Sequence, residues 1–165
     1  MSVAEGTVTH VYSADVATVF AMLTDAKFLR QRGEATGETD IDISVDDQTS
    51  VRVIRYTRSV RRELPSFAKR LFKATNVVRQ VETWRGDDNK TGSWDIEVDG
   101  APIKIHAKLS LRPHERGSEY RIEYAVRAKV PLIGKRLAAY TLKQTIEGFR
   151  AELGHNDAEL EKRIA

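Results

Sequence analysis

The residues of this chain best suited to acid–base or metal chemistry are its four histidines, His10, His106, His114 and His155. No HxH or HExxH spacing and no paired carboxylates accompany them, so their spacing brings no two ligands onto one face of a helix or strand. We therefore expect no metal. His10 would serve as a general base only if it pointed inward from its strand, and a structural role is the alternative.

Other catalytic signatures are also missing. The sequence has no GxSxG nucleophile elbow, no glycine-rich phosphate loop and no dinucleotide fingerprint. It has no cysteine, which excludes disulfides and thiolate chemistry. We expect no cofactor, and the sequence identifies no catalytic residue.

Two tyrosines are the first candidates for a binding site. Tyr120 and Tyr124 share one face of a predicted strand with Ile122, Val126 and Ala128. If that face is the inner one, two phenol hydroxyls enter an apolar interior, where each needs a hydrogen-bond partner or a ligand. Ordinary core packing is the alternative for both residues.

Further candidates for the wall of a cavity come from other predicted elements. Trp94 and Phe149 would add aromatic surface, and Thr141 and Thr145 of the last helix and Arg55 of a strand could supply polar contacts. As alternatives, the threonines would bond to carbonyl groups of their own helix, and Arg55 would be exposed to solvent.

A basic, amphipathic segment covers residues 52–73. Eight basic residues there oppose one acidic residue, Glu63, although the whole chain has a net charge of only +3. Apolar residues within it follow helical spacing and predict a short helix that could be a lid over a cavity entrance: Leu64, Phe67, Leu71 and Phe72. Such a helix could also touch anionic membrane surfaces, or simply pack on the sheet.

These residues are positioned by a characteristic order of elements. Apolar periodicity predicts a first strand over 7–12, helices from about 16 and over 25–32, and a C-terminal helix of about 25 residues opened by Pro131, whose end is frayed. Ser13 is the expected N-cap of the first helix, and Gly33 or Gly37 the end of the second. Strands are predicted between the helices over 40–46, 49–60, 75–84, 94–98, 103–111 and 120–130.

The faces of these strands are not equally clear. Alternation over 103–111 places its apolar residues inside and His106 on the solvent face. The strand over 75–84 stays ambiguous, because Val77 and Val81 compete with Val78 and Trp84 for the inner face.

Length and composition restrict the class of protein. The 165 residues fit one domain over 1–165, and the charge balance is too mild for a dedicated nucleic-acid binder. No leader pattern is present, and no apolar run approaches the roughly 20 residues of a membrane span. We expect a cytoplasmic monomer or weak dimer.

The order of elements resembles the START-like, or helix-grip, superfamily of lipid-transfer domains, plant pathogenesis-related proteins and polyketide cyclases. Three segments look like an uncharacterised bacterial family within it: Glu63–Phe67, Asp99–Pro102 and Val130–Lys135. The resemblance implies an α+β fold in which a curved antiparallel sheet of about seven strands wraps around a long C-terminal helix, with a hydrophobic cavity between them. It carries over no catalytic residues.

We therefore expect the protein to bind a small or medium hydrophobic ligand, lipid-like or aromatic, in this cavity. The first alternative is an enzyme of the polyketide cyclase or dehydratase kind, which a cluster of inward-facing ionisable residues would favour. The second is a peripheral protein that contacts anionic membranes transiently through residues 52–73. Base stacking on nucleic acid has little support, because the two Trp and five Tyr are not interleaved with the basic segment.

Overall fold

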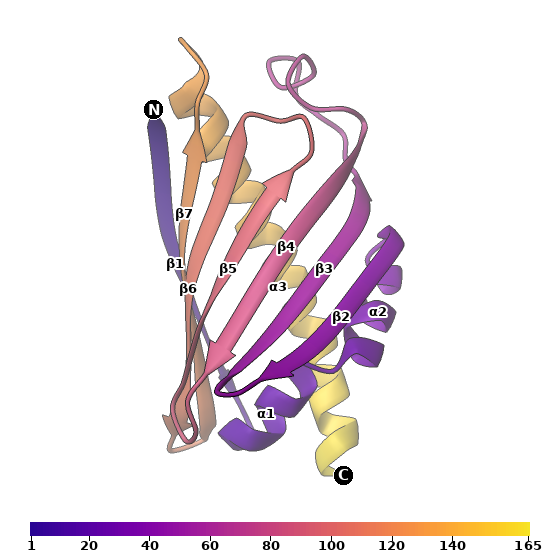
Figure 1. The fold of residues 1–165 in the computed structure, drawn as a ribbon, viewed down its shortest axis with the longest axis vertical. Coiled ribbons are helices and arrows are strands. Elements are labelled where there is room, and N and C mark those ends of the chain that lie inside the picture. The colour runs from indigo at the N-terminus through magenta and orange to yellow at the C-terminus, as the bar shows by residue number, and fades with distance from the viewer.

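Seven antiparallel strands form one curved sheet, and a long helix crosses its inner face (Figure 1). The strand order is β1-β7-β6-β5-β4-β3-β2, so the first strand pairs with the last. The computed structural model describes residues 1–165 with these elements: β1 (Ser2–Tyr12), α1 (Val16–Leu23), α2 (Ala26–Ala35), β2 (Thr39–Gln48), β3 (Val51–Arg61), β4 (Thr75–Arg85), β5 (Lys90–Val98), β6 (Ile103–His114), β7 (Gly117–Ala128) and α3 (Gly134–Ile164). The predicted α+β helix-grip architecture is confirmed.

The two short helices begin at aspartates. Asp15, rather than the expected Ser13, caps α1 by accepting a hydrogen bond from the Thr18 amide at 2.9 Å. Asp25 caps α2 in the same way through the Lys27 amide. A carboxylate at this position bonds to free amides and also meets the positive end of the helix dipole, which explains why it is preferred here.

The strands separate an inner from an outer face. The alternation predicted for β6 is confirmed, and His106 lies outside, with its Nδ1 2.8 Å from Asp95 Oδ1. The ambiguity of β4 is resolved in favour of the face that carries Val78, Glu82 and Trp84. Trp84 is 1% exposed, so the largest side chain of this strand decides which face is buried.

Helix α3 is longer and better anchored than the sequence indicates. It begins at Gly134, three residues after Pro131, and is continuous through Ile164. Its last turns are anchored to the rest of the domain, because Leu160 is 2% exposed and Arg163 forms an ion pair of 2.6 Å with Asp25. None of the three helices combines the length and the apolar character that crossing a bilayer demands.

The segment between β3 and β4 corrects a second prediction. Residues 64–72 form turns and not a helix, held by hydrogen bonds such as the one from the Phe72 amide to the Ala68 carbonyl. The apolar spacing is typical of a helix, but a short helix is stable mainly where its whole apolar face packs on one partner. Here Phe67 packs on Tyr140 of α3, whereas Leu64 and Phe72 line the interior space beside the sheet.

Gly33 of α2 makes room for a buried hydrogen bond, which leads to a stability prediction. A Cβ atom at this position would lie 2.5 Å from the Tyr56 hydroxyl and 2.7 Å from Glu38 Oε1. We expect Gly33→Ala to lower the free energy of unfolding by roughly 1 kcal/mol, despite the better helix propensity of alanine. Urea denaturation followed by circular dichroism measures the change.

The matched control is Gly154→Ala in α3, where an added Cβ would meet nothing within 4 Å. This variant should raise the free energy of unfolding by about 0.5–1 kcal/mol. Equal stabilisation by both substitutions would contradict the packing argument.

Candidate functional site

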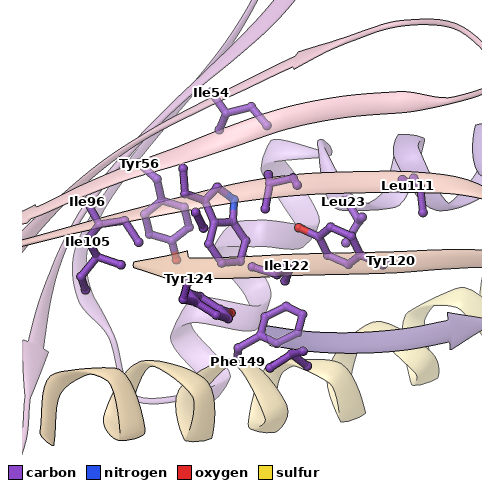
Figure 2. Packing of buried hydrophobic residues seen from close by; sticks show 14 of the residues in the cluster. Leu23, Ile54, Tyr56, Ile96, Ile105, Leu111, Tyr120, Ile122, Tyr124 and Phe149 are labelled. Carbon is purple, nitrogen blue, oxygen red and sulfur yellow. The ribbon is translucent and has the colours of Figure 1, made fainter. Parts of the chain in front are cut away.

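A cavity of about 340 Å³ lies between the inner face of the sheet and the helices α2 and α3. Eighteen of its 32 lining residues are hydrophobic, and the others, apart from Gly148, are polar or charged. Figure 2 shows Tyr120 and Tyr124 of β7 near Phe149 of α3, with Ile96 and Ile105 farther along the sheet. The space can therefore hold a mainly apolar molecule that also carries polar groups.

Six of the seven predicted wall residues line this cavity: Trp94, Tyr120, Tyr124, Thr141, Thr145 and Phe149. Their aromatic members form one cluster, in which the Trp94 ring lies 5.9 Å from the rings of both Tyr124 and Phe149. These distances are typical of favourable edge and tilted contacts between aromatic rings. The wall is therefore held in place even without a ligand.

Arg55 is the exception. It lies on the outer face of β3 and is exposed, whereas Arg58, on the opposite face of the strand, and Arg62, directly after the strand, line the cavity. Because side chains alternate along a strand, an odd-numbered residue of β3 cannot share the face of Ile54 and Tyr56. The assignment of Arg55 to the wall is corrected accordingly.

Only two of the four residues predicted to form a lid line the cavity. Leu64 and Phe72 line the cavity, whereas Phe67 and Leu71 do not. Phe67 instead packs between α3 side chains: its ring lies 5.7 Å from that of Tyr140 and 4.0 Å from the Arg136 guanidinium. The turns of residues 64–72 thus cover one end of the cavity and are fastened to the start of α3. Whether they contact a membrane stays a prediction.

Two buried hydroxyls in the cavity wall have no hydrogen-bond partner. These are Tyr124 Oη, on a residue that is 2% exposed, and Thr141 Oγ1, on one that is 7% exposed. Thr145 differs, since its hydroxyl donates to the Thr141 carbonyl at 2.7 Å. Burial raises the pKa of Tyr124 well above its usual range, so its hydroxyl stays protonated and can donate. Unsatisfied buried hydroxyls are uncommon and require an explanation.

Sequence reasoning missed a carboxylate at the centre of the wall. Glu82 of β4 lines the cavity, is 8% exposed and accepts hydrogen bonds from both indoles, at 2.6 Å from Trp84 and at close range from Trp94. Burial raises the pKa of Glu82 from its usual 4.5 to about 7, although the two indoles and the charge of Arg32 act in the opposite direction. Its position two residues before Trp84, on the same strand face, was the available signal.

A line of polar side chains connects Glu82 to the edge of the sheet. The Gln80 amide donates to Glu82 at 3.3 Å, and its oxygen accepts from Arg58 at 3.1 Å. Arg58 lies 3.7 Å from Glu38, whose carboxylate also accepts a short hydrogen bond from Tyr56. These five residues form a polar ladder across an otherwise largely apolar face.

A second polar group closes the cavity beside α2. Arg32 donates to Asn156 at 3.0 Å and lies 3.4 Å from Glu152, and Asn156 in turn donates to the Tyr12 hydroxyl at 3.1 Å. Burial alone would lower the pKa of Arg32, but the Glu152 carboxylate raises it above its usual value. This arginine therefore stays charged and ties α2 to α3.

His10 does not take part in the cavity. Its Nε2 lies 3.0 Å from Asp157 Oδ1, and its ring meets the Tyr12 ring edge-on at 4.6 Å. Since it is not among the lining residues, the structural interpretation of His10 applies rather than that of general base. No three His, Asp or Glu side chains lie together as a metal site requires.

Solved structures with this fold cover nearly the whole chain. A START superfamily protein from Mycobacterium smegmatis is 13% identical, covers 97% of each chain and has a TM-score of 0.59. TTHA0849 from Thermus thermophilus is 12% identical, with 98% and 100% covered and a TM-score of 0.64. The di-domain ARO/CYC BexL of the BE-7585A biosynthetic pathway is 15% identical and has a TM-score of 0.65; the match covers 96% of this chain and 50% of BexL.

At such low identity these similarities establish the fold alone. The protein thus has the helix-grip fold of START-like domains, as the order of its elements predicted. A search among curated proteins gives no match. Within this class, the chain belongs to the family described as "Protein of unknown function (DUF2505)", whose model matches residues 7–156.

The raised pKa of Glu82 predicts how stability depends on pH. The folded protein holds this proton more tightly than the unfolded chain, so the free energy of unfolding should fall as pH rises from 4.5 through about 7. Relative to Glu82→Gln, the wild type should lose up to about 3 kcal/mol over this range. Urea denaturation at several pH values measures the difference.

Glu161→Gln is the control, because Glu161 is an exposed glutamate of α3 outside every ion pair. Its stability difference from the wild type should change little with pH. If the difference between the wild type and Glu82→Gln were equally constant, Glu82 would not titrate as described.

Proposed function

We propose that this protein binds a small or medium-sized, mainly apolar ligand, lipid-like or aromatic, in the cavity between the sheet and α3. The observation that carries this proposal is the pair of unpartnered hydroxyls, Tyr124 Oη and Thr141 Oγ1, in the wall of a cavity of about 340 Å³. A buried hydroxyl without a partner costs free energy, and a ligand oxygen or nitrogen that bonds to either hydroxyl would remove part of that cost.

The lining also indicates the form of the ligand. Ile96, Ile105 and Phe149 offer an apolar surface, which favours a hydrocarbon or aromatic body. Tyr124 and Thr141 lie on β7 and α3, on the two sides of the space, so a polar group between them would fix the orientation of that body. Binding alone would suffice for transport, sequestration or sensing.

The first experiment is native mass spectrometry of the protein purified from its own host, followed by organic extraction. We expect a lipid-like or aromatic compound at a stoichiometry of about one per chain, because the structure has one large apolar cavity. A protein that carries nothing, and also takes up no compound from a broad panel of lipids and aromatics, would contradict the proposal.

Two substitutions separate binding from stability. Tyr124→Phe and Thr141→Val remove the unpartnered hydroxyls while conserving most of the side-chain volume. Without ligand, each variant should be as stable as the wild type or more stable, by up to about 1 kcal/mol, because an unsatisfied buried group is removed. Affinity for the extracted ligand should fall about 5–20-fold.

Thr145→Val is the matched control on the same helix, since the Thr145 hydroxyl already bonds to the Thr141 carbonyl. It should leave ligand affinity within about twofold of the wild type. Calorimetric titration and thermal unfolding give both quantities. A loss of stability in Tyr124→Phe and Thr141→Val, with unchanged affinity, would mean that the hydroxyls serve the fold.

A second candidate function is acid–base catalysis in the same cavity. Six acidic or basic residues line it (Arg32, Glu38, Arg58, Arg62, Glu82 and Glu152), and the pKa of Glu82 is raised to about 7. A carboxylate with such a pKa suits proton abstraction from a carbon beside a carbonyl group. Against this candidate, Glu38 and Glu152 are already paired with arginines.

Deuterium exchange tests this candidate directly. If the protein is an enzyme of this kind, carbonyl compounds extracted with it should gain deuterium beside the carbonyl when incubated with it in D2O. Glu82→Gln should lower that rate about 100-fold or more. Exchange at the uncatalysed rate with the wild type would count against catalysis and leave ligand binding as the function.

A further inference from the structure

Glu82 differs from the other two carboxylates of the cavity. Glu38 lies 3.7 Å from Arg58, and Glu152 lies 3.4 Å from Arg32, so each has a basic partner. No basic side chain lies within ion-pair distance of Glu82. It is thus the one carboxylate in the wall whose charge is not matched by a neighbouring cation.

The groups that do contact Glu82 are all neutral N–H donors. Oε1 accepts from Trp94 and Gln80, and Oε2 accepts from Trp84. A carboxylate that accepts three N–H bonds is held in one orientation, and about one of its four acceptor positions is left unused. These donors stabilise an ionised carboxylate without cancelling its charge.

The surroundings of Glu82 limit what could use that position. The positive charge of Arg32 on α2 lowers the pKa of Glu82, but this guanidinium already forms an ion pair with Glu152 and a hydrogen bond with Asn156. The negative charge of Glu152 on α3 raises the pKa of Glu82. The charge of Glu82 in turn helps to raise the pKa of the Tyr120 hydroxyl on β7. The residues of the protein therefore leave this carboxylate without a counter-charge, in a wall that faces the cavity.

We propose that Glu82 is the polar anchor of the cavity, and that it selects ligands whose apolar body carries a hydrogen-bond donor, a protonated amine above all. This inference rests on the proposed function and adds the chemical class of the ligand. An ammonium group at the unused acceptor position would form an ion pair in a water-poor site, where such pairs are strong. A ligand carboxylate at the same place would meet a like charge and be rejected.

Three ten-carbon probes that differ only in the head group test this selection: decylamine, decanol and decanoate. Calorimetric titration at pH 8 should give affinities in the order amine, alcohol, acid, with the amine at least about tenfold tighter than the acid. In Glu82→Gln the preference for the amine should shrink to within about threefold. Circular dichroism verifies that this variant is folded.

Glu161→Gln is the control, because Glu161 is an exposed glutamate of α3 outside the cavity lining. It should keep the order of affinities seen for the wild type. Measurement of the wild type at pH 5.5 gives a second readout that needs no variant: Glu82 then takes up its proton, and the advantage of decylamine over decanol should fall about tenfold or more from its value at pH 8.

The possible outcomes distinguish a failure of the Glu82 anchor from a failure of ligand binding in the cavity. If decanol binds as tightly as decylamine, the anchor proposal is overturned and the proposed function stands. The same holds if decylamine binds more tightly than decanol but does so equally in Glu82→Gln. If decanoate binds most tightly, the head group is held by a cation instead, for which Arg62 is placed in the lining with only Gln144 as partner. If none of the three binds, the anchor proposal is overturned for linear ten-carbon ligands, and the extraction and the broad ligand panel decide the proposed function separately.

Discussion

The seating of α3 on one side of the sheet is the constraint on which the cavity depends. The helix packs mainly on β1 and β7, where Gly6 lets it come close: a Cβ there would lie 3.1 Å from Ile146 and 3.5 Å from Leu142. A single helix cannot cover seven strands, so the inner faces of β3, β4 and β5 are covered only in part. Helix α2 lies beside β2 (Figure 1), and together with residues of the 64–72 turns it contributes to the lining of the remaining cavity.

Burial of charge beside this space is made tolerable by pairing. Arg58 is held by Glu38 and Gln80, and Arg32 by Glu152 and Asn156, so most of the ionic groups in the wall are satisfied by the protein. Such pairs add little net stability, because both partners give up their hydration, but a missing partner is costly. The polar ladder and the α2–α3 pair therefore fix the shape of the wall more than they stabilise the fold.

The sequence predicted the architecture well because the fold depends on patterns that span whole elements, such as the alternation from Ile103 to Leu111. The residues of the candidate site were harder to predict, since each depends on whether a single strand position faces the inside or the outside of the sheet. The arginines of β3 recur every three residues, and this spacing does not indicate whether Arg55 or Arg58 faces inward. Glu82 resembled a solvent-facing carboxylate, because the inner face of its strand could not be assigned from the sequence. Likewise, the sequence around Asn156 does not indicate that this residue is buried, because its partners Arg32 and Tyr12 are distant in the chain.

The pairing of the first and last strands also has a kinetic consequence. β1 joins β7 along its whole length, from Ser2 opposite Ala128 to Tyr12 opposite Ser118. Contacts so distant in sequence require closure of a very long loop, and folds dominated by them fold slowly. Until β1 pairs with β7, α3 cannot pack on Gly6 and its neighbours. The inner faces of the hairpins from β2 to β7 therefore stay exposed to solvent during this stage of folding. The same open face that later receives a ligand is, during folding, a site for aggregation or for a chaperone.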